Sequence, residues 1–219
     1  MSVLNDFLKN KTRMLFGIIT TLIVGFISLS YFVLITPPSY VDMHISEEIQ
    51  ERHNGTLEVI MKLVSWFGNL PQSLIIVIFA AILFFLFKLK REAIFTLLTL
   101  LSGVFSSSLK LLIGRPRPTE NLVRIIEKAK QQSYPSGHTL FYTVFFGFLI
   151  IAMGNLKHVN KVLKFAVISF SAGMIFLIPI SRVYLGAHWF TDVLGGFILG
   201  IVYLFILGYI YLGLKNPTQ

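Results

Sequence analysis

The chain has 219 residues, of which 55% are hydrophobic and only 13% are charged, and it contains no cysteine. A water-soluble core of this size does not need so much apolar sequence, so a mean hydropathy of +0.76 predicts an integral membrane protein. Without cysteine the chain has no disulfide, thiolate nucleophile or cysteine metal ligand. Its formal charge of +9 could suggest nucleic acid, but Lys and Arg cluster at the ends of apolar runs. Anionic lipid headgroups and loop orientation explain that placement better, so we expect the bilayer and no nucleic acid as a partner.

Six apolar runs are candidate membrane spans, and they predict an all-α, six-span transmembrane bundle. Their approximate limits are 15–35, 70–87, 93–110, 139–156, 163–180 and 191–214. The first run is too long for a simple signal peptide and lacks its cleavage pattern, so we expect it to be retained. We expect residues 1–219 to form a single domain.

Two polar segments separate these spans. In residues 39–69 apolar side chains recur near a period of 3.6, with acids between them and an interruption near Asn54-Gly55. This pattern predicts one or two amphipathic helices at the interface between the first two spans, acting either as a substrate gate or as a linker packed on the bundle. Residues 119–133 are polar and basic, and we expect a partial helix from Asn121 to Lys130.

Basic residues in the short connections predict the orientation, because cytoplasmic loops are enriched in Lys and Arg. With a cytoplasmic N-terminus, ten of the 19 basic residues fall inside, opposed there only by Asp6 and Glu92. These ten are Lys9, Lys11, Arg13, Lys88, Lys90, Arg91, Lys157, Lys161, Lys164 and Lys215. Both termini are then cytoplasmic, and the segments around Lys110, His138 and His188 all face the extracytoplasmic side.

The first of these segments carries Lys110 and Arg117, seven residues apart across a break at Gly114 and Pro116. Proline lacks an N–H donor and cannot continue the helix, so the chain bends and the two cations could converge on one anion. The alternative is a pair of interfacial cations that snorkel toward the headgroups.

The second segment, Tyr134 to His138, precedes an apolar run. Ser136 is a good helix N-cap, and Gly137 allows backbone N–H groups to approach a ligand closely. A helix N-terminus attracts anions, and His138 would place a proton donor or acceptor beside the bound group. An ordinary Pro-Ser-Gly turn with a structural histidine is the alternative.

The third segment carries Ser181, Arg182, His188 and Asp192. His188 and Asp192 are four residues apart, so on a helix they would share one face. A carboxylate that accepts a hydrogen bond from one imidazole nitrogen makes the other nitrogen more nucleophilic. The pair could instead be a satisfied polar contact, but ionisable residues at membrane depth are costly and are by default functional.

Together the three segments supply three cations, a helix N-terminus and two histidines. The cations suit a phosphoryl group, and the histidines suit a nucleophile and a general acid that work through a phosphohistidine. Asp192 would be the only carboxylate in the set, so we expect neither a metal site nor another cofactor.

These segments resemble the sequence motifs of a known family. Lys110–Pro118 resembles K-x6-RP, Pro135–His138 resembles PSGH, and Ser181–Asp192 resembles SR-x5-H-x3-D, in the order found in the type 2 phosphatidic acid phosphatase superfamily. All three motifs are complete, whereas residues 1–105 carry none. The resemblance implies that His188 is the nucleophile, Asp192 its orienter and His138 the acid for the leaving oxygen. It also implies that Lys110, Arg117, Ser136, Gly137 and Arg182 bind the phosphate.

The small size and the basic turns are similar to those of bacterial members of the membrane branch, such as phosphatidylglycerophosphatase B and undecaprenyl pyrophosphate phosphatases. We therefore expect a metal-independent lipid phosphate phosphatase of the cell membrane, acting at the outer leaflet. Its substrate would be undecaprenyl pyrophosphate, phosphatidylglycerophosphate or phosphatidic acid. A lipid phosphotransferase and a non-enzymatic lipid transporter are the alternatives. The sequence ranks neither the lipids nor the oligomeric states.

Overall fold

The computed structural model describes residues 2–36, 38–52 and 54–214, with side chains described from residue 13. These residues form nine helices and no strand, which confirms the all-α prediction. The helices are α1 (Ser2–Ile35), α2 (Tyr40–Glu51), α3 (Gly55–Trp66), α4 (Gln72–Leu86), α5 (Lys90–Leu98), α6 (Leu101–Ile113), α7 (Gly137–Asn155), α8 (Lys161–Tyr184) and α9 (Phe190–Gly213).

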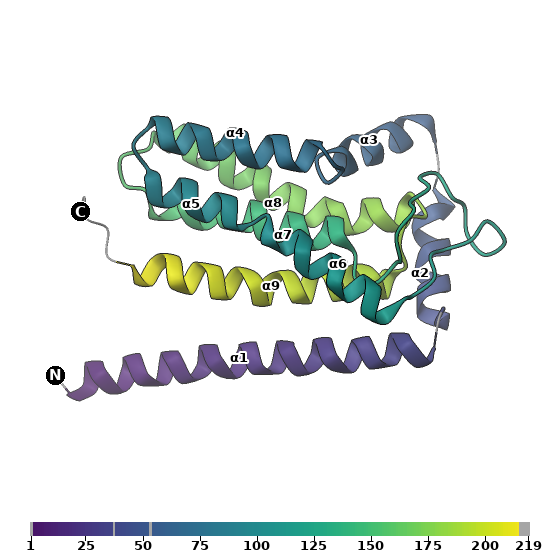
Figure 1. Ribbon diagram of the computed structural model, residues 1–219, viewed down its shortest axis with the longest axis horizontal. Coiled ribbons are helices and arrows are strands. Elements are labelled where there is room, and N and C mark those ends of the chain that lie inside the picture. Colours follow the sequence, from purple (N-terminus) through teal and green to yellow (C-terminus); the bar gives the residue numbers. More distant parts are fainter. Residues whose placement is uncertain (1, 37, 53, 215–219) are drawn as a thin grey trace.

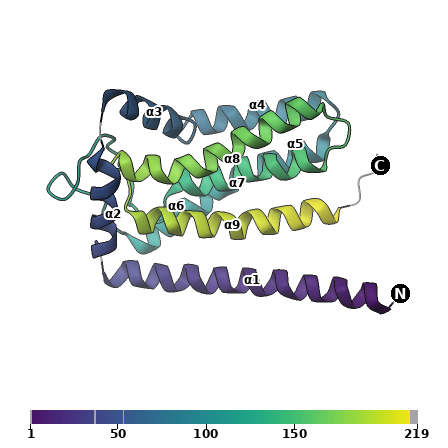
Figure 2. The ribbon, with the colours of Figure 1, turned by 180° about the vertical axis from the view of Figure 1, so that it is seen from behind.

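Helix α7 is the centre of the bundle. It packs against α8 and α9 over most of its length and against α5 and α6 on another side (Figure 1). Its aromatic side chains Phe145, Phe146 and Phe148 are almost fully buried. Helix α1 stands beside the bundle and contacts α9, while α2 lies across one end and contacts α8 and α9 (Figure 2). Residues at the start of α7 are therefore held among several helices.

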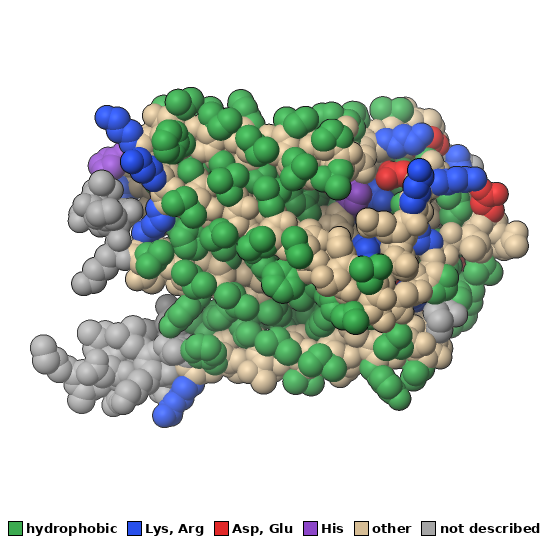
Figure 3. Space-filling view, in the orientation of Figure 1, with side chains coloured by type: hydrophobic (Ala, Val, Ile, Leu, Met, Phe, Trp, Pro, Cys, Tyr) green, Lys and Arg blue, Asp and Glu red, His purple; other side chains and the backbone are tan. Residues whose placement is uncertain are grey.

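Five helical rods are long and apolar enough to cross a membrane, and the chain is a multi-pass membrane protein. The rods are Arg13–Ile35, Lys90–Ile113, Gly137–Asn155, Lys161–Tyr184 and Phe190–Gly213. Apolar side chains cover their outer surface in a broad belt (Figure 3). The span predicted at 70–87 is α4, whose 15 residues extend about 22 Å and so fall short of a hydrocarbon core of about 30 Å.

The sequence predicted one or two helices between the first two spans, and the structure has two, α2 and α3. Ser39 caps α2 through a capping box with Asp42, and the Asn54 side chain caps α3 by accepting from the Leu57 N–H. The predicted interruption near Asn54-Gly55 is thus confirmed and has a local cause, since Asn is a strong N-cap.

The predicted helix from Asn121 to Lys130 was wrong. These residues form turns and bends, and their backbone groups bond to other parts of the chain. The N–H groups of Ile126 and Glu127 donate to the Leu185 carbonyl at 3.0 and 3.1 Å, and the Gln50 side chain bonds both backbone groups of Arg124. Tertiary hydrogen bonds replace the i to i−4 ladder here.

The two short basic connections lie at the same end of the bundle. The links from α4 to α5 and from α7 to α8 share an end with the start of α1, and the three motif segments lie at the other end (Figure 1). Lys215 lies outside the described residues, as do the side chains of Lys9 and Lys11. The grouping of the motif segments at one end agrees with the prediction, while the side of the membrane on which they lie stays a prediction.

Candidate active site

His188 is held in a tight connection between α8 and α9. Gly186 within it has a φ of +65°, and a Cβ there would lie 2.1 Å from the Arg124 carbonyl oxygen, so only glycine fits. His188 is 2% exposed, and its Nδ1 lies 3.5 Å from Asp192 Oδ2. Its Nε2 lies 3.4 Å from Arg117 Nη1, which can only donate. The lone pair of Nε2 therefore faces the cations, and the ring proton is on Nδ1, on the side of Asp192 and the Ser133 hydroxyl.

The contact between His188 and Asp192 was predicted on a shared helix face, but it forms across the start of α9. Trp189 is the N-cap of that helix, and its N–H donates to Asp192 Oδ2 at 2.9 Å. The Ser133 hydroxyl also donates to Oδ2 and lies 3.4 Å from His188 Nδ1. Asp192 is fully buried, and this set of donors holds its carboxylate in place behind the imidazole.

The predicted bend brings Lys110 and Arg117 to the same stretch of chain, residues 131–133. Helix α6 ends at Ile113, and its C-cap Gly114 has a φ of +63°, which turns the chain back. Lys110 Nζ donates to the Gln132 carbonyl at 2.6 Å, and Arg117 donates to the carbonyls of Gln131 and Ala187, each at 2.5 Å. Burial and then the charge of Arg182 lower the pKa of Arg117 to about 10, so this guanidinium stays protonated at neutral pH.

Arg182 reaches the same region from the last turn of α8. It is 1% exposed, and its Nη1 donates to the Ser65 hydroxyl and to Glu127 Oε1, the latter at 3.0 Å. Glu127 is thus a second carboxylate near the cations, and the expectation that Asp192 would be the only one was wrong. No group of three or more His, Asp or Glu side chains in the described part of the chain is arranged to hold a metal ion.

The start of α7 is built as predicted. Ser136 is the N-cap, with its hydroxyl accepting from the Thr139 N–H at 3.4 Å, and Gly137 is the first helical residue. The first N–H groups of a helix have no partner within it and can bind an anion. The Ser136 N–H donates to the Asp192 carbonyl at 2.9 Å, which ties this turn to α9. His138 is half-buried, and its Nε2 lies 2.9 Å from the Asn69 amide oxygen.

Charge and burial set the protonation of His188. Burial, followed by the cations Arg117, Lys110 and Arg182, lowers the pKa of this imidazole well below 6.5. The ring is therefore neutral at pH 7, the form that carries a nucleophilic lone pair. The arrangement can bind a phosphoryl group with cations while the neutral imidazole faces it.

Several residues of the site were not predicted from the sequence. Arg115 stands between the predicted Lys110 and Arg117, yet it points away from the cations to Asp192 and Asp42, at 2.5 and 2.6 Å. In the sequence Asp42 is only one of the acids among the apolar positions of residues 39–69. Ser133 and Asn69 carried no signal at all, because each acts through a contact with a residue far away in the chain.

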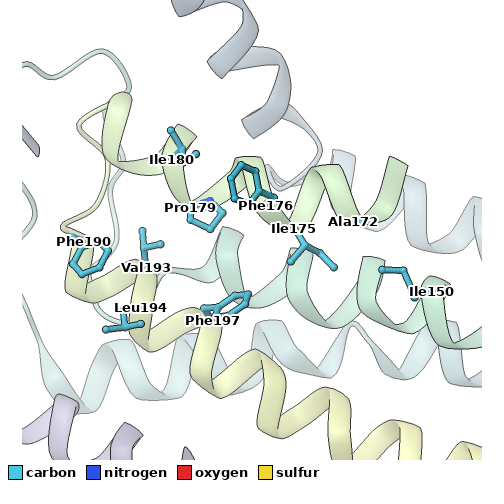
Figure 4. A pocket seen from close by; sticks show the side chains of 10 residues that line it. All are labelled: Ile150, Ala172, Ile175, Phe176, Pro179, Ile180, Phe190, Val193, Leu194 and Phe197. Carbon is cyan, nitrogen blue, oxygen red and sulfur yellow. The ribbon is translucent and has the colours of Figure 1, made fainter. Parts of the chain in front are cut away.

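An apolar groove of about 470 Å³ runs between α8 and α9 near the site (Figure 4). On α9 it is lined by Phe190, Val193, Leu194 and Phe197, which share one face, and its ten lining residues are all apolar. Asp192 projects about 100° away from Val193 around the helix. The groove therefore follows the lipid-facing side of α9, away from the carboxylate.

Fold and site define a class: a helical multi-pass membrane protein with a buried histidine–carboxylate pair facing three cations. The chain belongs to the PAP2 superfamily, whose sequence profile matches residues 91–215. Phosphatidylglycerophosphatase B of Bacillus subtilis (strain 168) is 42% identical over 77 residues, 34% of this chain and 37% of that protein. Lipid phosphate phosphatase delta of Arabidopsis thaliana is 26% identical over 169 residues, 71% of this chain and 39% of that protein. The matches thus span under two fifths of either relative.

Two solved structures share the fold. One is the crystal structure of a transmembrane PAP2 type phosphatidylglycerolphosphate phosphatase from Bacillus subtilis, with a TM-score of 0.75 and 27% identity. That superposition covers 91% of this chain and 98% of the other. The second is Aquifex aeolicus LpxE, with a TM-score of 0.61 over 82% of this chain and 99% of the other. At 24% identity the second likeness concerns the fold alone.

Proposed function

We propose that the protein is a lipid phosphate phosphatase that works through a phosphohistidine. The observation that carries this proposal is the two-sided environment of His188, with Asp192 behind Nδ1 and Arg117 before Nε2. A neutral nucleophile aimed at a cluster of cations suits attack on a phosphoryl group. The names of the relatives, a phosphatidylglycerophosphatase and a lipid phosphate phosphatase, support a lipid phosphate as the substrate.

We assign the steps of the reaction to the two histidines. The Nε2 lone pair of His188 forms a bond to phosphorus, the bond from phosphorus to the lipid oxygen breaks, and protonated His138 gives its proton to that oxygen. A water molecule then attacks the phosphohistidine, and His138 takes a proton from it. The phosphorus–nitrogen bond breaks, releasing phosphate and restoring His188. Lys110, Arg117, Arg182 and the N–H groups at Gly137 would hold the phosphate oxygens throughout, with Ser136 as the N-cap that sets those groups in place.

The position of His138 also suggests how the lipid lies. His138 must be next to the leaving oxygen, and that oxygen carries the lipid tail. His138 is half-buried and contacts Asn69 in the link between α3 and α4, where the neighbouring Leu70 is 74% exposed. We place the tail on this side, leaving toward the bilayer between that link and α6. Undecaprenyl pyrophosphate, phosphatidylglycerophosphate and phosphatidic acid each carry a terminal phosphate whose leaving oxygen stays with the rest of the lipid.

The decisive assay is release of phosphate from a panel of these lipids by the purified full chain and by His188→Ala. We expect release by the parent protein and none by the variant. A transferase would instead move phosphate to an added lipid or sugar acceptor. A protein that only transports lipid would release no phosphate from any member of the panel, which would refute the proposal.

We further propose that α4 is the sixth membrane span, shorter than the others because α3 precedes it at one end. The site would then lie on the extracytoplasmic face. The two short basic connections at the opposite end support this orientation. Single cysteines at Thr119 and His158, both exposed, would test it in intact cells. An impermeant maleimide should label position 119 and spare position 158, and the reverse pattern would place the site in the cytoplasm.

A further inference from the structure

Asp42 is a fully buried carboxylate on α2, in the part of the chain that precedes all three motifs. Its Oδ1 accepts from the backbone N–H of Thr191 at 2.9 Å and from the Thr191 hydroxyl at 2.8 Å. Its Oδ2 accepts from Ser39 and from Arg115 Nη2, the latter at 2.6 Å. Asp42 therefore contacts both the residue before Asp192 and the arginine that binds Asp192.

Arg115 joins the two carboxylates. It is 2% exposed, and its Nη1 donates to Asp192 Oδ1 at 2.5 Å while its Nη2 donates to Asp42. The same Nη1 donates to the Thr191 hydroxyl at 2.7 Å. A planar guanidinium presents its donors in a fixed fork, so holding one carboxylate fixes the direction of the donor that reaches the other.

The charges of this cluster explain why two carboxylates are present. Arg115 alone would cancel the charge of Asp192, and the carboxylate behind His188 would no longer favour a positive ring. With Asp42 the cluster of two carboxylates and one guanidinium carries a net charge of −1. When His188 Nε2 bonds to phosphorus and Nδ1 keeps its proton, the ring becomes positive, and a negative cluster close to Nδ1 stabilises it.

We propose that Asp42 is a positioning residue for His188, acting through Arg115 and Asp192, so that α2 is part of the catalytic apparatus. This inference rests on the proposed function. It gives the helix across the end of the bundle a chemical role in place of the gate or linker considered from the sequence.

A purely structural role for Asp42, which would only pin α2 to α9, predicts different behaviour. A structural ion pair affects the amount of folded protein and its stability. A positioning role lowers the turnover number of the folded protein and leaves the binding of phosphate intact. The second pattern is expected because Lys110, Arg117 and Arg182 make no contact with Asp42 among the described side chains.

The test compares Asp42→Asn with Glu47→Gln, which removes the same charge from an exposed position on the same helix. We expect kcat of Asp42→Asn on a lipid phosphate to fall about 10- to 100-fold, as for other residues that orient a primary ligand. KM and competitive inhibition by inorganic phosphate should stay at parental values, and Glu47→Gln should match the parent. A folded Asp42→Asn with parental kcat would overturn the inference.

The pH profile supplies a readout that a structural role would not move. The charged groups that face His188 are Asp192 directly, Arg117 at 3.4 Å, and Lys110 and Arg182 nearby, with Ser133 as a neutral partner. Removing the charge of Asp42 makes this surrounding more positive and lowers the pKa of His188 further. The acid limb of kcat/KM should therefore shift to lower pH in Asp42→Asn, and an unmoved limb would count against the inference.

Arg115→Lys keeps the proposal testable if Asp42→Asn does not fold. Lysine keeps the charge but cannot hold two carboxylates with one fork, so it should reproduce the loss in kcat. The double variant should lose no more kcat than the worse single variant, because both substitutions act on His188 through the same contacts with Asp192. If the two losses in kcat multiply instead, Asp42 does not act through Arg115. If the parent protein releases no phosphate, the proposed function fails, and if the parent is active while both single variants match it, only this inference fails.

Discussion

Gly196 on α9 packs closely against the turn that begins α7. A Cβ built at this position would lie 2.5 Å from the Ser136 carbonyl oxygen, whereas ordinary contacts of a Cβ begin at 3.4 Å. Gly196→Ala therefore requires the two segments to separate by about 0.9 Å. The obstacle is backbone, which cannot rotate away as the end of a side chain can.

Two opposing contributions set the change in stability caused by Gly196→Ala. Replacing glycine by alanine inside a helix stabilises it by about 1 kcal/mol. Forcing an extra carbon into a packed contact costs about 1–3 kcal/mol. We expect a net loss of stability, and a shift near 1 Å at the Ser136 turn should lower turnover up to about 100-fold.

The assay pairs thermal unfolding in detergent with phosphate release, using Gly173→Ala on α8 as the matched control. A Cβ at Gly173 meets nothing within 4 Å, so that variant should be as stable as the parent or more stable. Equal stability and equal turnover of the Gly196 and Gly173 variants would refute the argument that close packing at Gly196 sets the geometry of the site.

Three further predictions concern the chemistry. His138→Ala should lose much less activity on p-nitrophenyl phosphate than on a lipid phosphate, because the phenolate needs little protonation, and equal losses on both would contradict its role as the acid. Because burial and the neighbouring cations lower the pKa of His188 well below 6.5, its imidazole stays neutral as the pH falls through 6.5. The acid limb of kcat/KM should therefore lie below pH 6.5, and loss of activity centred at 6.5 or above would contradict that environment. Activity should survive EDTA and be inhibited by vanadate, and loss in EDTA that Mg²⁺ restores would contradict phosphate binding by Lys110, Arg117 and Arg182.

Local chemistry in the sequence predicted the parts of the site that lie on single elements. The Ser136 cap, the chain reversal after Lys110 and the contact between His188 and Asp192 each depend on residues within a few positions of one another. The causes of the first two are the N-cap and the helix break. The four-residue spacing predicted the third contact, but its geometry comes from Asp192 folding back to the N-cap of α9, outside which His188 lies. Apolar length likewise predicted the helical membrane class.

Only the tertiary structure decided which distant groups complete the site. Asp42 contacts Arg115 across 73 positions and Thr191 across 149, and no local pattern relates them. The loop at 119–133 has helix-compatible residues, but bonds to Gln50 and Leu185 hold its backbone open. A buried carboxylate or carbonyl takes its partner from whichever segment the packing brings within hydrogen-bond distance. The sequence thus predicted His188 as the proposed nucleophile and the cations that face it, while packing of α2 against the start of α9 decided which groups lie behind Asp192.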